Sequence, residues 1–355
     1  MQIFLDNIVF TIQKAGGVSV YWYELLQGIC RTGIPVSFMN TGLTPGNIFE
    51  QRINYNNYSC IRESWIPHQY LRYLPVRYRL PEKSVFHGGY LRIAKQKNVL
   101  NILTVHDFAH ERKLATRFPR GLANIRQKAY GIKRADGIIC ISDSTRQELM
   151  HFYPDTDPAK IRVIHHGIAD DFREVMKNKT EPYVLYVGAR ANYKNFDIAL
   201  ATMKLLPPSY KLVAAGGGPW SKQEMQAIEA AIPGRYKILQ TVDIQQLNRL
   251  YNDAFCLLYP SSYEGFGFPP GEAMKAGCPV VSTNATSIPE VTGRAGLLTN
   301  EITAAAFAEK ILTLENDIFR ERIIQDGLHQ AALFTWEKSV NKTIQFYKDC
   351  WNNKF

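Results

Sequence analysis

Short apolar runs alternate along the chain with longer segments in which apolar positions recur at helical spacing. The runs predict buried strands, and the longer segments predict amphipathic helices. Alternating strands and helices favour parallel sheets with crossover helices, so the predicted fold class is α/β. The predicted strands cover 2–6, 36–40, 84–87, 101–105, 137–142 and 161–165, and then 183–187, 211–215, 236–240, 255–259, 279–283 and 296–298.

The two sets of strands predict two Rossmann-like domains, 1–168 and 169–335, facing each other across a cleft. A chain of 355 residues is long enough for two such domains. The polar segment 167–182 carries no strand pattern and is the predicted linker. Two helices of the first domain are expected after Gly17, ending at Gly33, and over 120–134. The last segment, 336–355, holds a helical pattern that we expect to cross back to the N-terminal domain.

The segment EGFGFPPGEAMKAGCPVV, from Glu264 to Val281, carries the most chemical information. Pro269 and Pro270 suit the first turn of a helix, where a missing N–H is tolerated. This predicts a short helix over 271–276, with Glu264 in the preceding loop and Glu272 in the first turn. The start of a helix presents backbone N–H groups and a positive dipole to anions such as phosphate.

Glycines surround the two carboxylates, which are separated by seven residues. Gly265, Gly267 and Gly271 allow the backbone to approach a ligand closely. The carboxylates can accept hydrogen bonds from hydroxyls while the amides face a phosphate. The segment is therefore predicted to hold a polyol phosphate.

Other candidate residues follow predicted strands, where ligands bind in open α/β sheets. Arg190 and Lys194 follow strand 183–187 and offer two cations to a leaving diphosphate. The Gly16–Gly17 turn precedes a helix and can present amides to a phosphate. His106 and Asp107 end strand 101–105, and an alternative role for them is a structural turn. The segments HGG (87–89) and ISDS (141–144) are candidates for the acceptor side.

The positive charge is uneven along the chain. Residues 1–168 contain 22 Lys and Arg against 12 Asp and Glu, whereas residues 169–355 contain 20 of each, so the first half carries the whole net charge of +10. Its densest part runs from Arg72 to Lys97. The basic residues between these ends are Arg77, Arg79, Lys83, Arg92 and Lys95, and the aromatic residues nearby are Trp65, Tyr70, Tyr73 and Tyr78. Such interleaving suits an anionic membrane surface, and the alternative is a solvated positive face.

The six cysteines are scattered and form no C-x-x-C pair or zinc-site spacing. No apolar run is long enough to span a bilayer, and the N-terminus does not read as a signal peptide. A cytoplasmic protein is expected, peripheral on the inner face of the plasma membrane if the basic half binds lipid.

The motifs together resemble the retaining glycosyltransferases of family 4, which have the GT-B fold of two Rossmann-like domains. Glu264 and Glu272 match the family's Glu–seven residues–Glu signature. SIPEVTGRAGLLTN (287–300) resembles its Pro-Glu-Val-x-Gly stretch, and YVLYVGARANYKNF (183–196) resembles the segment that opens the donor domain. With the Gly-Gly turn and TVHD (104–107), the resemblance spans nearly the whole chain.

The resemblance implies a role for each matching residue. Glu272 would bind the ribose of the nucleotide, and Glu264 would contact hydroxyls of the donor sugar. His106 would contact the sugar near its 6-position and the reaction centre. Further donor contacts are expected from Gly16, Gly17, Gly265, Phe266, Gly267 and Phe268.

One position departs from the family pattern. Lys194 matches the lysine of the family's basic pair, but many members have Arg immediately before it, and here that residue is Tyr193. Arg190 is therefore our candidate for the second cation.

The resulting interpretation is a hexosyltransferase that moves a hexose from a nucleoside-diphosphate sugar to a hydroxyl of a glycan or lipid-linked acceptor. Cell-surface polysaccharide assembly is the setting that the resemblance implies. It also implies no metal, no other cofactor and no covalent enzyme intermediate, because the leaving phosphate acts as the base. The alternatives are a sugar phosphorylase or nucleotide-sugar epimerase of the same fold, or a non-catalytic nucleic-acid-binding protein, for which no motif is present. Binding of nucleic acid is therefore not expected. The base, the hexose, the acceptor and the oligomeric state stay open.

Overall fold

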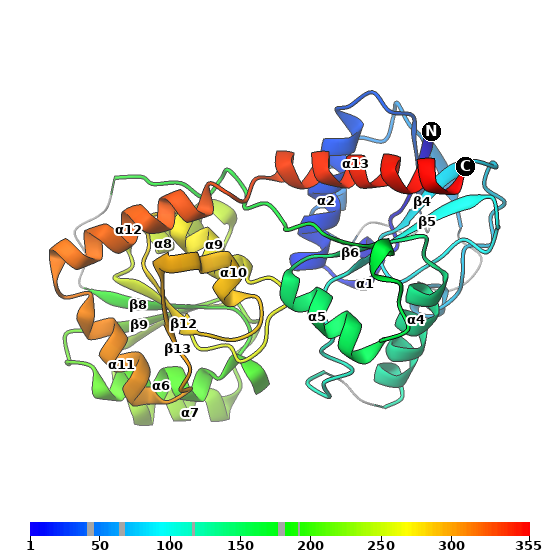
Figure 1. Ribbon diagram of the computed structural model, residues 1–355. Coiled ribbons are helices and arrows are strands. Elements are labelled where there is room, and N and C mark those ends of the chain that lie inside the picture. Colours follow the sequence, from blue (N-terminus) through cyan, green and yellow to red (C-terminus); the bar gives the residue numbers. More distant parts are fainter. Residues whose placement is uncertain (41–45, 64–67, 116–117, 177–181, 191) are drawn as a thin grey trace. The chain divides into compact units, whose positions relative to one another are not determined.

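The computed structural model of the chain describes residues 1–40, 46–63, 68–115, 118–176, 182–190 and 192–355 (Figure 1). It contains two compact units. The first comprises Met1–Gly167 and Trp336–Phe355, and the second comprises Ile168–Thr335. Part of the predicted linker, 177–181, lies outside the described residues, as does Trp65.

The first unit is built on a seven-stranded sheet in which every pairing is parallel, in the order β3-β2-β1-β4-β5-β6-β7. Its strands are β1 (Gln2–Asp6), β2 (Val36–Asn40), β3 (Ser59–Arg62), β4 (Ser84–Gly88), β5 (Val99–Val105), β6 (Gly137–Cys140) and β7 (Ile161–Val163). Its helices are α1 (Val9–Ile12), α2 (Gly17–Cys30), α3 (His68–Leu71), α4 (Arg120–Arg134), α5 (Asp143–Phe152) and α13 (Trp336–Lys354), with 3-10 turns at Glu50–Arg52 and Pro158–Lys160.

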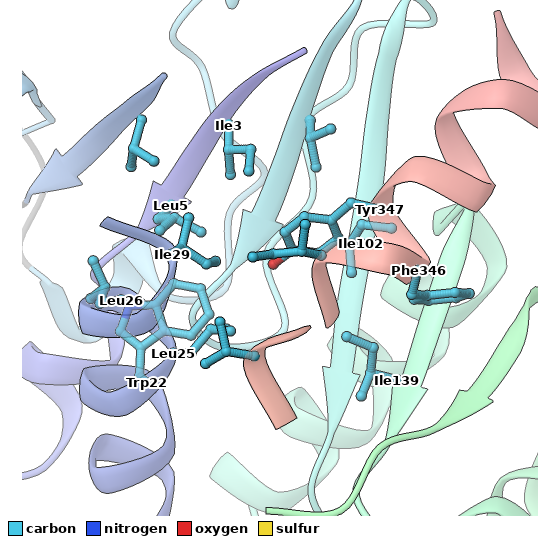
Figure 2. Packing of buried hydrophobic residues seen from close by; sticks show 14 of the residues in the cluster. Ile3, Leu5, Trp22, Leu25, Leu26, Ile29, Ile102, Ile139, Phe346 and Tyr347 are labelled. Carbon is cyan, nitrogen blue, oxygen red and sulfur yellow. The ribbon is translucent and has the colours of Figure 1, made fainter. Parts of the chain in front are cut away.

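The main core of this unit lies between the sheet and the helices α2 and α13. Figure 2 shows Trp22, Leu25 and Ile29 of α2 and Tyr347 of α13 directed toward the strands. The two helices contact each other because Gly28 has no side chain: a Cβ atom there would lie 2.4 Å from a methyl group of Val340. The C-terminal helix is therefore an integral part of the first unit's core.

The second unit repeats the design with six parallel strands in the order β10-β9-β8-β11-β12-β13. Its strands are β8 (Tyr183–Val187), β9 (Lys211–Ala215), β10 (Tyr236–Leu239), β11 (Cys256–Tyr259), β12 (Val280–Thr283) and β13 (Gly296–Thr299). Its helices are α6 (Phe196–Leu205), α7 (Lys222–Ala231), α8 (Ile244–Asp253), α9 (Phe268–Lys275), α10 (Ile288–Thr292), α11 (Ala304–Thr313) and α12 (Asp317–Ala331), with 3-10 turns at Asn192–Lys194 and Gly293–Ala295.

Every strand expected from the apolar runs is present, with ends shifted by at most two residues. One strand was not predicted. β3 reads SCIR, and most of its side chains are exposed, so it lacks an apolar run and is defined by its pairing with β2.

Two arginines of the basic segment are less exposed than an interleaved surface of charges suggests, one buried and one half-buried. Arg92 is buried, where it pairs with Asp6 and Glu63. Arg72 stacks on Tyr73 and Tyr90 and donates to Asn124. A count of charges along the sequence cannot distinguish such arginines from exposed ones. In the described part of the chain, no helix combines the length and the apolar character needed to cross a membrane.

Candidate active site

Lys194 and Glu264 follow the two strands at the centre of the second sheet. The chain moves outward in one direction from β8, through β9 to β10, and in the other from β11, through β12 to β13. Loops therefore diverge at the carboxyl ends of β8 and β11, which is where open α/β sheets bind ligands. Lys194 lies seven residues beyond Val187, the end of β8, and Glu264 lies five residues beyond Tyr259, the end of β11.

Hydrogen bonds tie these two loops together. The Ser262 amide donates to the Tyr193 carbonyl at 2.8 Å, and the Asn195 side chain donates to the Pro260 carbonyl at 2.8 Å. Asn195 has a φ of 51°, a left-handed conformation that asparagine tolerates better than most residues. The loops thus fix Lys194 beside the loop that carries Glu264.

Lys194, Glu264 and Tyr259 form a compact polar cluster. The Nζ of Lys194 lies 2.5 Å from Oε1 of Glu264 and 3.2 Å from the Tyr259 hydroxyl, which also donates to Oε1 of Glu264 at 2.5 Å. Burial, followed by the charge of Glu264, raises the pKa of Tyr259 well above its ordinary value, so this hydroxyl keeps its proton. The side chains of Lys194 and Glu264 are 18% and 12% exposed. An ammonium group has three donors, so one beyond these two contacts is available to a ligand.

The backbone around Glu264 is held by the segment that follows β12. The Thr286 hydroxyl accepts from the Glu264 amide at 2.9 Å. The Ser287 hydroxyl donates to the carbonyls of Glu264 and Phe266, both at 2.9 Å. Ser287 opens the stretch that resembles the family's Pro-Glu-Val-x-Gly segment, and its role here is to shape the glycine-rich loop.

Helix α9 begins earlier than the sequence predicted. It starts at Phe268 rather than Gly271, because Gly267 turns the chain with a φ of 100° and the prolines take the next two helical positions. The expectation that Glu272 lies in the first turn is therefore wrong, since it is the fifth residue of the helix. Pro269 and Pro270 also remove two of the N–H donors that a helix start otherwise presents.

Glu272 projects from the second turn of α9 and accepts a hydrogen bond of 3.0 Å from the Tyr251 hydroxyl of α8. Burial raises the pKa of Glu272 to about 7, and the bond from Tyr251 opposes this shift. The residue keeps some solvent exposure. A carboxyl group that titrates near neutrality can change its charge when a ligand binds or the pH changes.

Arg190 makes a different set of contacts from Lys194. Its guanidinium pairs with Glu224 at 2.7 Å, donates to carbonyls of the loop 216–219 and lies 4.2 Å from the centre of the Trp220 ring. The bond from the Ser221 amide and then the bond from Arg190 lower the pKa of Glu224 to about 2. In this structure Arg190 thus braces the loop after β9.

The remaining predicted residues belong to the first unit. Gly16 caps helix α2, and Gly17 is its first residue. His106 follows β5, with its ring 5.2 Å from that of Tyr21, which projects from α2. Burial lowers the pKa of His106 to about 4, so its imidazole is neutral at ordinary pH.

His87, a candidate for the acceptor side, is fully buried instead. Its ring nitrogens bond to the hydroxyls of Tyr347 and Thr104, and Thr104 also bonds to Tyr21. These bonds link helix α13 through β4 and β5 to α2. His87 therefore holds the fold together and does not line a surface.

The sequence carries no signal that marks Tyr259 and Tyr251 as site residues. Both lie in ordinary apolar or amphipathic patterns and carry no motif. Among the described residues of either unit taken alone, no three His, Cys, Asp or Glu side chains are grouped closely enough to hold a metal ion. The metal-free assignment stays a prediction.

Comparison with known families matches both units. A family model described as Glycosyltransferase Family 4 matches residues 15–172, and one described as Glycosyl transferases group 1 matches residues 168–330. The O-antigen chain mannosyltransferase B of Escherichia coli is 39% identical over 173 residues, 47% of this chain and 45% of that protein. The O-antigen chain mannosyltransferase RfbU of Salmonella typhimurium is 29% identical over 188 residues, 52% of each chain. The chain thus spans about half the length of these relatives.

Solved structures resemble the chain over nearly its whole length. Sucrose-phosphate synthase from Thermosynechococcus elongatus has a TM-score of 0.79 at 21% identity, covering 99% of this chain and 100% of that one. WaaG, a glycosyltransferase involved in lipopolysaccharide biosynthesis, has a TM-score of 0.70 at 15% identity, with 97% and 98% covered. With the two parallel sheets, these likenesses confirm the predicted GT-B fold class.

Proposed function

Since this chain belongs to glycosyltransferase family 4, we propose that it is a retaining hexosyltransferase that uses a nucleoside-diphosphate sugar. The observation that carries this proposal is the Lys194–Glu264 pair at the carboxyl ends of β8 and β11. A partly accessible cation can bind the diphosphate of such a donor, and the carboxylate beside it can bind hydroxyls of the sugar. The second unit would bind the donor, and the first would bind the acceptor.

Each side chain in the second unit has a proposed task. Lys194 would donate to the diphosphate and stabilise the charge that develops as it leaves. Glu264, held in place by Lys194 and Tyr259, would accept hydrogen bonds from sugar hydroxyls. Glu272 would accept hydrogen bonds from the ribose while its carboxyl is ionised. Arg190 would act by holding the loop 216–219, and a direct contact with the diphosphate would require it to exchange partners.

In the proposed reaction the bond between the anomeric carbon and the diphosphate breaks. The acceptor hydroxyl forms the new bond on the same face and gives its proton to the leaving phosphate. No enzyme nucleophile is needed. In the first unit, neutral His106 could donate one hydrogen bond to the sugar, and the Gly16–Gly17 turn could present amides to the phosphates.

The names of the relatives support a setting in polysaccharide assembly. Two of them are O-antigen chain mannosyltransferases, and WaaG is involved in lipopolysaccharide biosynthesis. These names support the proposal that the chain acts in the assembly of a cell-surface glycan, on a glycan or lipid-linked acceptor, with mannose first among the hexoses to test. A cytoplasmic enzyme peripheral to an anionic membrane fits the positive charge of residues 1–168.

Two measurements test this function. A thermal-shift panel of UDP, GDP and ADP with their sugars should identify one nucleotide, because a ligand at 100 times its Kd stabilises a fold by about 2.7 kcal/mol. NMR of the product then reads the anomeric configuration. Retention of the donor's configuration is expected, and inversion would refute the proposed mechanism.

Activity assays with the nucleotide sugar identified by the panel separate the alternative enzymes. A phosphorylase would release sugar phosphate when given inorganic phosphate, and an epimerase would convert the nucleotide sugar without an acceptor. Transfer that depends strictly on an acceptor hydroxyl excludes both.

A further inference from the structure

The first unit contains a basic groove near the amino-terminal end of β5. His106 follows the carboxyl end of the same strand. We define this basic groove as the hollow of about 740 Å³ lined by Leu74, Pro75, Val76, Arg77, Tyr78, Arg79, Glu82, Lys95, Gln96, Lys97 and Asn98. Four of these residues are cationic and one is acidic, a formal charge of 4 − 1 = +3. The volume lies in the range of small-molecule sites.

The walls of the basic groove are two segments that run side by side. The main chains of Val76 and Ala94 form a parallel bridge, with the Val76 amide donating to the Ile93 carbonyl at 3.0 Å. The amide group of Gln96 bonds to both the N–H and the carbonyl of Leu80, each at 2.7 Å. The walls are therefore fixed at two points.

Apolar packing beneath the walls makes this frame rigid. Val76, Leu80 and Ala94 are at most 5% exposed and belong to one buried cluster with Phe4, Met39, Phe86 and Val99. The residues between these anchors face outward. Arg77, Tyr78 and Arg79 are exposed on one wall, and Lys95 and Lys97 are exposed on the other.

Three of the four cations of the basic groove, Arg79, Lys95 and Lys97, form no ion pair in the described part of the chain. The acid Glu82 lines the same hollow. Like charges held together repel one another, and an anion bound between them would remove this repulsion.

Within the first unit, the basic groove lies at the opposite end of β5 from His106. Asn98 immediately precedes β5, and His106 immediately follows it. A strand of seven residues separates the two ends by roughly 20 Å. A ligand in the basic groove would thus be remote from His106.

We propose that the basic groove is a second anion site, which binds a ligand carrying two or more phosphate charges. Arginine forks match phosphate oxygens in pairs, and lysines add point charges from the facing wall. The phosphate can come from a lipid headgroup or from a soluble compound. This inference does not depend on the proposed transferase activity.

The test is a binding measurement with two arms. One arm titrates the full chain with inorganic tripolyphosphate, and the other uses phosphatidylcholine vesicles with and without cardiolipin, whose headgroup carries two phosphates. The groove variant carries Arg77→Gln, Arg79→Gln, Lys95→Gln and Lys97→Gln. The matched control carries Arg31→Gln, Lys133→Gln, Lys342→Gln and Lys348→Gln, four exposed residues of the same unit that do not line the basic groove.

The groove variant should bind at least about tenfold more weakly than wild type, or about 1.4 kcal/mol, with the control near wild type. Weaker binding of tripolyphosphate by the groove variant identifies a soluble source of the phosphate. Weaker binding by this variant only to the anionic vesicles identifies a lipid headgroup. Tripolyphosphate can also bind the donor residues, so the titration is repeated in Lys194→Ala, which should keep the groove-dependent binding. Equal losses in the groove and control variants, or no binding in either arm, would overturn the proposal.

Discussion

Each of the two sheets has an ion pair after two neighbouring strands, with the acid and the base exchanged between the units. The two ion pairs differ in burial. In the first unit, the acid Asp6 ends β1 and the base Arg92 follows β4. In the second unit, the base Lys194 follows β8 and the acid Glu264 follows β11. Each pair thus joins two neighbouring strands at the point of the sheet where the loops diverge.

The ion pairs of Arg92 and Lys194 differ in burial and in the number of carboxylates that contact the cation. Arg92 and Asp6 are 1% and 2% exposed, and Glu63 adds a second buried carboxylate at 2.6 Å from the guanidinium. Burial raises the pKa of Asp6 to about 6, against the effect of Arg92. The Lys194 pair keeps 18% and 12% exposure. The same topology therefore yields a sealed structural cluster in one unit and a partly accessible cluster in the other.

The largest expected effect tests the sealed cluster. Arg92→Ala would leave two carboxylates buried without a cation, which should lower the free energy of unfolding of the first unit by about 3–5 kcal/mol. Urea titration of the full chain measures this loss. The control, Arg79→Ala, removes an exposed charge and should change stability by no more than about 0.5 kcal/mol. A loss below about 1 kcal/mol for Arg92→Ala would show that the cluster is not structural.

A substitution in the accessible cluster should lower the activity of the protein and not its stability. Lys194→Ala should lower kcat by about 10²–10³, as loss of one transition-state donor typically does, with little change in Tm. Lys204→Ala, an exposed lysine of α6, is the control and should leave both unchanged. A near-native rate would remove Lys194 from the mechanism.

Arg190 should show an intermediate response because it braces the loop 216–219. Arg190→Ala should lower both the rate and the Tm, with a stability loss of about 1–3 kcal/mol. Glu224→Gln keeps the shape of the partner and should have a smaller effect on the Tm. If Arg190→Ala lowers the rate alone, the arginine contacts the donor directly rather than through the loop.

The pH dependence of Glu272 gives a smaller effect with a defined sign. Its pKa is about 7 in the folded protein against an ordinary value of 4.5, so the folded protein holds a proton that the unfolded chain releases. Stability should therefore fall as pH rises from 4.5 to about 7 and level off above, and Glu272→Gln should remove this contribution.

The same titration should affect donor binding in the opposite direction. The ionised carboxyl accepts hydrogen bonds from the ribose, so nucleotide affinity should increase as pH rises through about 7. Calorimetric titration across this range measures the change. An affinity that follows the same pH profile in Glu272→Gln would exclude Glu272 as the cause.

The smallest expected effect is that of chelation. Transfer activity should be unchanged in EDTA, because Lys194 and backbone amides are proposed to stabilise the diphosphate. Complete loss, restored by a divalent ion, would contradict the metal-free assignment.

The sequence could predict the strands and the loops that carry Lys194 and Glu264, because apolar periodicity and glycine-rich turns are local signals. It could not predict the Asp6–Arg92–Glu63 cluster, whose members are brought together by strands far apart in the chain. It placed the start of α9 too late, because the conformation of Gly267 and not the prolines sets that boundary. Tyr251 and Tyr259 belong to the site because they donate to Glu272 and Glu264, and these contacts follow from the fold and not from a local sequence signal.

The position of helix α13 has a consequence for the order in which the protein can mature. Residues of α13, among them Phe346 and Tyr347, complete a core whose members outside this helix lie within the first 164 residues (Figure 2). During synthesis the ribosome must therefore make the whole second unit before the first can close its core. The second unit, continuous from Ile168 to Thr335, can fold first. Until α13 emerges, the apolar surface around Gly28 of α2 that Val340 covers stays exposed, so a chaperone that binds exposed apolar segments should engage the nascent N-terminal half.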